Sequence, residues 1–128
     1  MDEFIWQGEV RANELDPQGI VNNAHYLCYF DHVRTLQMKA LEMDWVELSR
    51  KGFNLVRVHA DIRFINSLRA FERFEVHSTF AQEGRLKLIF EQTIYCEGRL
   101  ICEAKNTIAC VNTMLNKPVA LKDVIILR

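Results

Sequence analysis

The chain has 128 residues, of which 49% are hydrophobic, and its formal charge at pH 7 is −1. This length suits one globular domain, covering residues 1–128, with a core but no room for a second domain. The small net charge gives no electrostatic basis for binding nucleic acid or an anionic membrane surface.

The composition also predicts where the protein acts. No apolar run is long enough to span a bilayer, and the chain opens without the basic start and apolar stretch of a signal peptide. Cysteines in this context are expected to be reduced and mostly buried, in a soluble cytoplasmic protein without membrane insertion. None of the four forms a Cys-x-x-Cys motif: Cys28, Cys96, Cys102 and Cys110.

The first half of the chain predicts one strand and one long helix. Residues 4–12 are rich in aromatic and β-branched side chains, which are typical of a strand. Residues 24 to 43 contain neither Gly nor Pro, and apolar residues recur there at helical spacing. This helix is apolar over most of its circumference, as expected if a sheet largely encloses it. Its polar line includes Asp31 and Arg34, which can form an ion pair.

The second half changes to the period of a strand after a short amphipathic segment near Trp45 and a break at Gly52. Residues 56–64 alternate apolar and polar side chains, which predicts a strand with one dry face formed by Val56, Val58, Ala60, Ile62 and Phe64. Runs at 71–81, 86–96 and 100–112 predict three more strands, joined by hairpin turns at 83–85 and 97–99. One strand, a long helix and four strands in meander-like succession favour an α+β fold, with an antiparallel sheet curled around one helix.

A tight turn before the helix carries the clearest candidate for chemistry. Pro17 biases Asp16 away from helical geometry, and Gly19 permits a positive φ angle. Asn22 or Asn23 can cap the helix that follows. A carboxylate near the unpaired amides of a helix start is one half of a hydrolytic site, because the amides can polarise a carbonyl. The structural alternative is a capped turn with no catalytic role.

The sequence of this turn and helix resembles the signature of hotdog-fold acyl-CoA thioesterases of the 4-hydroxybenzoyl-CoA thioesterase type. The residues that carry the resemblance are Asp-x-x-Gly-Ile-Val-Asn-Asn-Ala-His-Tyr-Leu at 16–27 and Tyr-Phe-Asp-His-Val-Arg at 29–34. The specific match covers about residues 10–36, and the pattern of elements continues over nearly the whole chain. The resemblance implies a hotdog fold, in which a sheet of about five strands wraps one long central helix. It also implies hydrolysis of an acyl-CoA thioester to free acid and coenzyme A.

The resemblance assigns roles to individual residues. Asp16 corresponds to the acid that acts as nucleophile or general base, and Gly19 to the turn residue that lets the substrate approach. Asn23 holds the position whose backbone N–H points at the thioester oxygen. Some relatives carry His where this chain has Asn23 and Asn where it has His25, so a role taken over from that His does not transfer. His25 either lines the acyl or sulfur site or is a packed or surface imidazole.

The remaining expectations concern coenzyme A, metals and assembly, and those on coenzyme A and assembly come from the resemblance. Arg69 matches the turn whose basic residues meet the phosphates of coenzyme A, and Arg63, Arg99 and Lys105 are weaker candidates. His and Cys residues do not cluster in the sequence, so we expect no metal and no cofactor besides the coenzyme A of the substrate. Similar enzymes form their sites between two subunits, which implies a homodimer or a homotetramer.

Three other functions remain open at this stage. The chain is compatible with a non-catalytic hotdog protein that binds acyl thioesters. It is also compatible with an acyl carrier protein thioesterase, because coenzyme A and acyl carrier protein share the pantetheine arm. A hotdog hydratase is less well supported, because the chain lacks that group's spacing between Asp and His. The acyl group is not specified by the sequence.

Overall fold

The structure is a computed structural model that describes residues 3–43 and 45–121. Its first half contains β1 (Phe4–Glu9), a short 3-10 helix η1 (Ala12–Glu14), the long helix α1 (His25–Ala40) and the short helix α2 (Trp45–Arg50). The strands β2 (Phe53–Phe64), β3 (Arg73–Glu83), β4 (Lys87–Cys96) and β5 (Arg99–Asn112) follow, and the short β6 (Lys117–Pro118) pairs with the end of β5.

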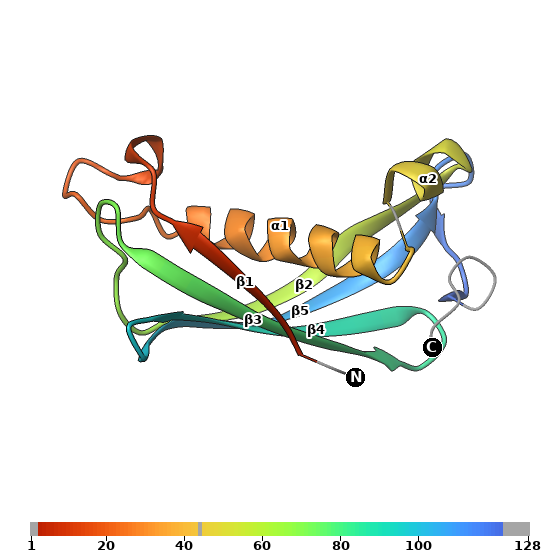
Figure 1. Cartoon of the computed structure of the whole chain (residues 1–128). Helices are drawn as coiled ribbons and strands as arrows, with labels where there is room; N and C mark the ends of the chain where they lie inside the picture. The colour runs from red at the N-terminus through yellow and green to blue at the C-terminus, as the bar shows by residue number, and fades with distance from the viewer. Residues whose placement is uncertain (1–2, 44, 122–128) are drawn as a thin grey trace.

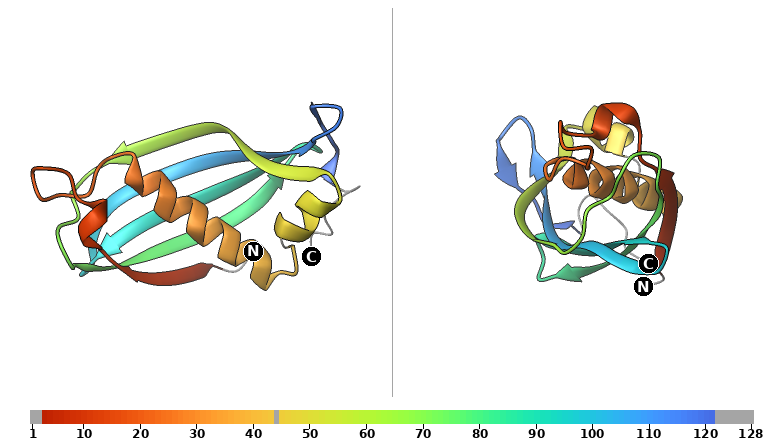
Figure 2. Two further views of the ribbon diagram at one scale, coloured as in Figure 1. Left: turned by 90° about the horizontal axis from the view of Figure 1, so that it is seen from above. Right: turned by 90° about the vertical axis from the view of Figure 1, so that its left-hand side faces the viewer.

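The strands form one antiparallel sheet that curls around α1, as Figure 1 shows. Seen along the helix in Figure 2, the sheet lies beneath α1 and rises on both sides of it. The strand order is β1-β3-β4-β5-β2. The predicted α+β hotdog architecture is therefore confirmed.

The position of β2 corrects the predicted meander of four strands. Only β3, β4 and β5 form a meander, joined by the predicted hairpin turns at Gly84 and Gly98. The free side of β3 is taken by β1, so β2 crosses over and pairs with the far side of β5. This leaves β2 as one edge of the sheet and β1 as the other.

One face of α1 packs against the sheet. Tyr26, Tyr29, Phe30 and Val33 are buried at intervals of three and four residues, which is the spacing of one helix face. The opposite side includes the exposed Cys28, so the sheet encloses the helix less completely than the sequence indicated. The buried stripe fixes how α1 lies on the sheet, and thus where its first turn is placed.

A β-bulge in β2 corrects the predicted dry face. The register shifts between Arg57 and His59, and an extra residue at that point exchanges the two faces of a strand. Before the bulge, Arg57 faces α1, where it bonds to the carboxylate of Asp31, while Val56 and Val58 are 37% and 53% exposed. After the bulge, Ile62 packs against the core as predicted.

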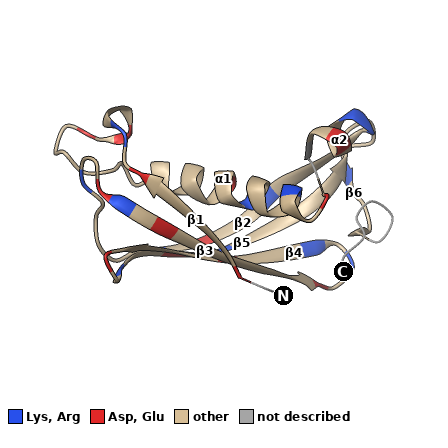
Figure 3. Ribbon diagram, viewed as in Figure 1, with Lys and Arg blue, Asp and Glu red and all other residues tan. Residues whose placement is uncertain are grey.

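Basic and acidic residues are mixed along the chain, and in Figure 3 the blue and red segments are interspersed. The predicted ion pair within α1 is confirmed, with 3.7 Å between Arg34 Nη2 and Asp31 Oδ1. All four cysteines are free, and all except Cys28 are buried. Burial raises the pKa of Cys102 to about 12, so its thiol stays protonated at neutral pH. Within the described residues, no helix has the length and apolar character needed to cross a bilayer.

Candidate active site

The loop that carries Asp16 is a small hairpin between η1 and α1. Leu15 pairs with Val21, and the Asp16 N–H donates to the Ile20 carbonyl at 2.8 Å. The Gly19 N–H donates back to the Asp16 carbonyl at 3.0 Å, and Gly19 has a φ angle of 81°. This pattern is a four-residue turn followed by a glycine bulge, which requires the positive φ that the sequence predicted.

The Asp16 carboxylate is ordered by its own loop. Its Oδ1 atom accepts the N–H of Gln18 at 2.8 Å and the N–H of Ile20 at 3.4 Å. Its other oxygen, Oδ2, has no hydrogen-bond partner within the described chain, and the side chain is only partly buried. The hydrogen bonds therefore join Asp16 to loop amides, whereas the sequence suggested amides at the start of the helix.

Asn22 accepts two hydrogen bonds at the start of α1. Its Oδ1 atom accepts the Ala24 N–H at 2.9 Å, and its carbonyl accepts the His25 N–H at 2.8 Å. Asn22 thus bonds to the turn that precedes the helix, whereas Ala24, which directly precedes α1, has no side-chain capping bond, so neither predicted asparagine is the N-cap residue. The N–H of Asn23 has no acceptor within the described part of the chain, and Asn23 is exposed. A donor at this position is available to a ligand.

A buried glutamate, which sequence reasoning missed, lies beneath the loop. The carboxylate of Glu14 accepts the Tyr29 hydroxyl at 2.8 Å and lies 3.0 Å from His25 Nε2. The N–H of Arg11 donates to it at 2.8 Å, and the Arg11 guanidinium forms an ion pair with it at 3.1 Å. The Glu14 carbonyl accepts the Asn22 N–H at 3.3 Å. Glu14 therefore connects the segment before the Asp16 loop with the segment between this loop and α1.

This network explains the protonation states of its members. Burial alone raises the pKa of Glu14, but the hydrogen bonds from Arg11, Tyr29 and His25 outweigh burial and lower it. Glu14 is therefore a carboxylate at neutral pH. Burial and the bond to Glu14 raise the pKa of Tyr29, so Tyr29 remains a neutral phenol that donates its proton.

Arg69 lies at the same end of the molecule as Asp16. It pairs with Ile20 across an isolated β-bridge, and its N–H donates to Glu72 Oε1 at 2.6 Å. Arg69 is exposed, so its side chain is accessible at the rim of the loop. The weaker phosphate candidates differ: Arg63 and Arg99 lie 3.4 and 3.5 Å from Glu103 and Glu72, respectively.

Comparison with known proteins identifies the family. A family model described as the thioesterase-like superfamily matches residues 10–127. A protein named acyl-acyl carrier protein thioesterase ATL2, from Arabidopsis thaliana, is 36% identical over 101 residues, or 77% of this chain. The chain belongs to the thioesterase-like superfamily. The match covers 54% of the Arabidopsis protein, so this thioesterase-like chain spans about half the length of that relative.

Two further similarities agree with this family. A Bacillus subtilis protein named putative acyl-CoA thioesterase YneP is 29% identical over 115 residues, which are 89% of this chain and 83% of that protein. A crystal structure described as a DHNA-CoA thioesterase from Staphylococcus aureus superposes with a TM-score of 0.90 and 20% identity, covering 96% of this chain and 83% of that one. The structural match shows the shared fold. The resemblance to acyl-CoA thioesterases of the hotdog type is confirmed.

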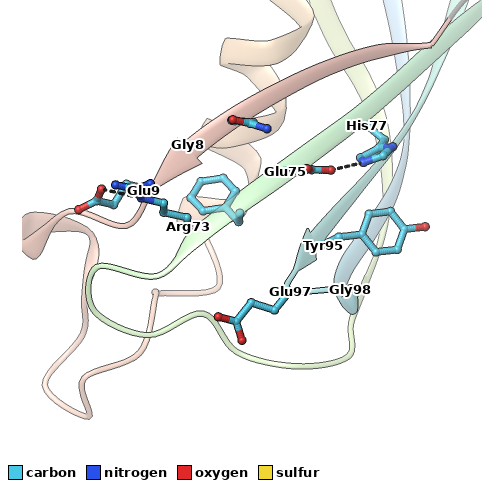
Figure 4. A pocket seen from close by; sticks show the side chains of 10 residues that line it. Gly8, Glu9, Arg73, Glu75, His77, Tyr95, Glu97 and Gly98 are labelled. Carbon is cyan, nitrogen blue, oxygen red and sulfur yellow. Dashed lines mark hydrogen bonds and ion pairs between the residues drawn. The ribbon is translucent and has the colours of Figure 1, made fainter.

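A hollow of about 800 Å³ opens elsewhere on this thioesterase-like chain. It is lined by residues of β1, β3, β4 and the β4–β5 turn, and Figure 4 shows Glu75, His77 and Tyr95 among them. Asp16, Asn23 and His25 do not line it. Among the described residues, His, Cys, Asp and Glu form no group of three or more that is placed to hold a metal ion.

Proposed function

We propose that this protein is an acyl-CoA thioesterase that hydrolyses its substrate to free acid and coenzyme A without a cofactor. The observation that carries the proposal is the state of Asp16. One carboxylate oxygen is held by two loop amides, while the other has no hydrogen-bond partner within the described residues, on a side chain that is only partly buried. A carboxylate fixed in this way is oriented for reaction before the substrate arrives.

The reaction requires an attacking group and an oxyanion donor. Asp16 either attacks the thioester carbon, expelling the thiolate and forming an anhydride that water cleaves, or takes a proton from a water that attacks directly. In both routes the backbone N–H of Asn23 donates to the carbonyl oxygen as negative charge develops there. A single-turnover reaction in water labelled with a heavy oxygen isotope distinguishes the two routes by mass spectrometry of the protein. Only the anhydride route can leave labelled oxygen in the Asp16 carboxylate.

The test of this proposal is thiol release from acyl-CoA esters that differ in chain length and aromaticity, with Asp16→Asn as the main variant. Asparagine keeps an oxygen that can accept from Gln18 and Ile20 but loses the charge. We expect kcat to fall on the order of a hundredfold or more, with little change in Tm or substrate binding. Glu83→Gln is the control, because it also removes one carboxylate charge but at an exposed position at the end of β3, which is neither in the loop nor on the β2 edge. A folded Asp16→Asn protein with near-normal turnover would contradict the mechanism.

An acyl carrier protein thioesterase is the second candidate, favoured by the name of the Arabidopsis relative. A direct comparison of kcat/KM for one acyl group on coenzyme A and on acyl carrier protein decides between the two carriers. If the wild-type protein binds acyl thioesters but releases no thiol from either, a binding protein without turnover replaces both proposals.

We also propose that the site is completed by a second subunit. Phe64, at the end of the edge strand β2, lies 5.9 Å from Tyr26 between ring centroids, so this edge reaches the first turn of α1. A copy paired along β2 would therefore approach the Asp16 loop. A homodimer or homotetramer, the single domain and the cytoplasmic location all stay predictions.

A further inference from the structure

The buried carboxylate of Glu14 is not used by the mechanism above, although it lies beneath the loop that carries Asp16. Its side chain is 1% exposed, and it accepts hydrogen bonds at both oxygens. A buried charge of this kind is costly unless it is fully paired. The pairing of Glu14 therefore also constrains the residues that bond to it.

The two oxygens of Glu14 serve different partners. Oε1 accepts the N–H of Arg11 and the hydroxyl of Tyr29, each at 2.8 Å. Oε2 faces His25 Nε2 at 3.0 Å and the Arg11 side chain. A carboxylate only accepts hydrogen bonds, so the His25 nitrogen that faces it must carry a proton.

This bond determines the tautomer of His25. With its proton on Nε2, a neutral imidazole has an unprotonated Nδ1, which accepts hydrogen bonds. Within the described chain, Nδ1 has no partner, and the side chain is 29% exposed. The ring is also fixed by an edge-on contact with Tyr29, with 5.0 Å between centroids. His25 thus presents a fixed acceptor at the first residue of α1, two residues after Asn23.

We propose that Glu14 is a positioning residue for this site: it holds the proton of His25 on Nε2 and so presents Nδ1 to the substrate or to water. The inference rests on the proposed function for its kinetic effect, but the tautomer itself is independent of turnover. Glu14 does not touch the substrate. It acts through His25, as carboxylates commonly orient imidazoles.

The first test measures the tautomer by nitrogen NMR of the His25 side chain, at about pH 9, where an ordinary imidazole is neutral. We expect the Nε2–H form in the wild type. In Glu14→Gln the side-chain oxygen stays with the two donors at Oε1, which places the amide NH₂ toward His25. An NH₂ group donates to Nε2, so the Nδ1–H form should gain population. An Nδ1–H tautomer in the wild type, or no change in the variant, would overturn the proposal.

The second test measures kinetics and separates positioning from folding. We expect Glu14→Gln to lower kcat on the order of tenfold or more while KM changes less. Glu83→Gln, at an exposed position of β3, is the matched control and should behave as wild type. In a His25→Gln background, Glu14→Gln should have no further effect on kcat, because its route through the imidazole is already lost.

Losses that multiply in the double variant would show that Glu14 acts structurally and not through His25, which overturns the proposal. If the wild type releases no thiol from any ester, the proposed function fails, whereas the NMR result still decides the role of Glu14. Should Glu14→Gln not fold, the wild-type tautomer remains decisive.

Discussion

The buried hydroxyl of Tyr26 accepts a hydrogen bond from the backbone N–H of Leu68, with 3.1 Å between the oxygen and the nitrogen. The carbonyl of the same Leu68 accepts the Val21 N–H at 2.9 Å. One residue between β2 and β3 therefore holds both the end of the Asp16 loop and the first turn of α1. The position of the candidate site depends on this attachment.

Tyr26→Phe should destabilise the protein because it removes the acceptor of a buried N–H. Leu68 is fully buried, so water cannot replace the hydroxyl. We expect a loss of about 1–3 kcal/mol in the free energy of unfolding, measured by denaturant titration. Tyr95→Phe is the control, since the Tyr95 hydroxyl has no hydrogen bond within the described chain. An equal loss in both variants would argue against the specific bond.

Gly19→Ala should strain the loop without creating a clash. A Cβ atom at Gly19 would meet nothing within 4 Å, but its φ of 81° is unfavourable for alanine. We expect a stability loss of about 1–2 kcal/mol from the backbone conformation. Gly84→Ala, with a φ of 66° and equally open space, should lose a similar amount. Only Gly19→Ala should also lower kcat/KM, and equal kinetics in the two variants would place Gly19 outside the site.

The sequence allowed the α+β class, the long helix and the Asp16 turn to be predicted because each rests on local chemistry. Helical spacing set the extent of α1, and the paired glycine turns set β3 to β5. The first strand ends at Glu9, earlier than predicted, because the chain turns into η1 at Ala12. The β2 bulge has no signature in residue type, and so Val56 and Val58 were assigned to the buried face of the strand although both are exposed.

Glu14 was missed for a related reason. It closes a capping box with Arg11, but the usual signature has Ser or Thr at the first position, and arginine gives no such signal. Its bonds to His25 and Tyr29 span 11 and 15 residues, and they exist only once the loop folds onto the helix. The roles of Asp16, Asn23, Gly19, His25 and Arg69 stay predictions.

The pH dependence of stability should include a contribution from His77. Its ring nitrogens lie 3.1 Å from Glu3 and 2.9 Å from Glu75, the latter pair being drawn in Figure 4. Burial lowers the pKa of His77, but the bonds to Glu75 and Glu3 outweigh burial and raise it. A raised pKa stabilises the fold below the unfolded value of about 6.5, and this contribution disappears as pH rises through the folded value.

His77→Gln should therefore cost more stability at about pH 5.5 than at about pH 8.5, as measured by urea unfolding at both values. The control variant is His59→Gln, because the exposed His59 has no carboxylate within hydrogen-bonding distance in the described residues. If His77→Gln loses the same free energy of unfolding at both pH values, the protonated His77 side chain does not contribute to the pH dependence of stability.

Arg69→Ala should affect binding of the nucleotide part of coenzyme A. The backbone N–H of Arg69 keeps its bond to Glu72 in this variant, so the turn is preserved. We expect KM for a coenzyme A ester to rise about tenfold, and KM for a pantetheine ester without the nucleotide to change little. Arg50→Ala is the control, because α2 lies at the opposite end of the sheet from the loop (Figure 1). Equal effects on both esters would remove Arg69 from the phosphate site.

Charge on the β2 edge should disrupt assembly. The outer side of β2 is unpaired in the sheet order, and Val58 is 53% exposed on it. A long edge strand presents a row of unpaired N–H and C=O groups to which the strand of another chain can bond. We expect light scattering to show a homodimer or homotetramer for the wild type, and a shift toward monomer with loss of thiol release for Val58→Lys. Ile5→Lys places the same charge on the opposite edge strand, at 50% exposure, and should keep at least the dimer. A wild-type protein that is strictly monomeric at micromolar concentration and still turns over substrate would exclude a site shared between two subunits.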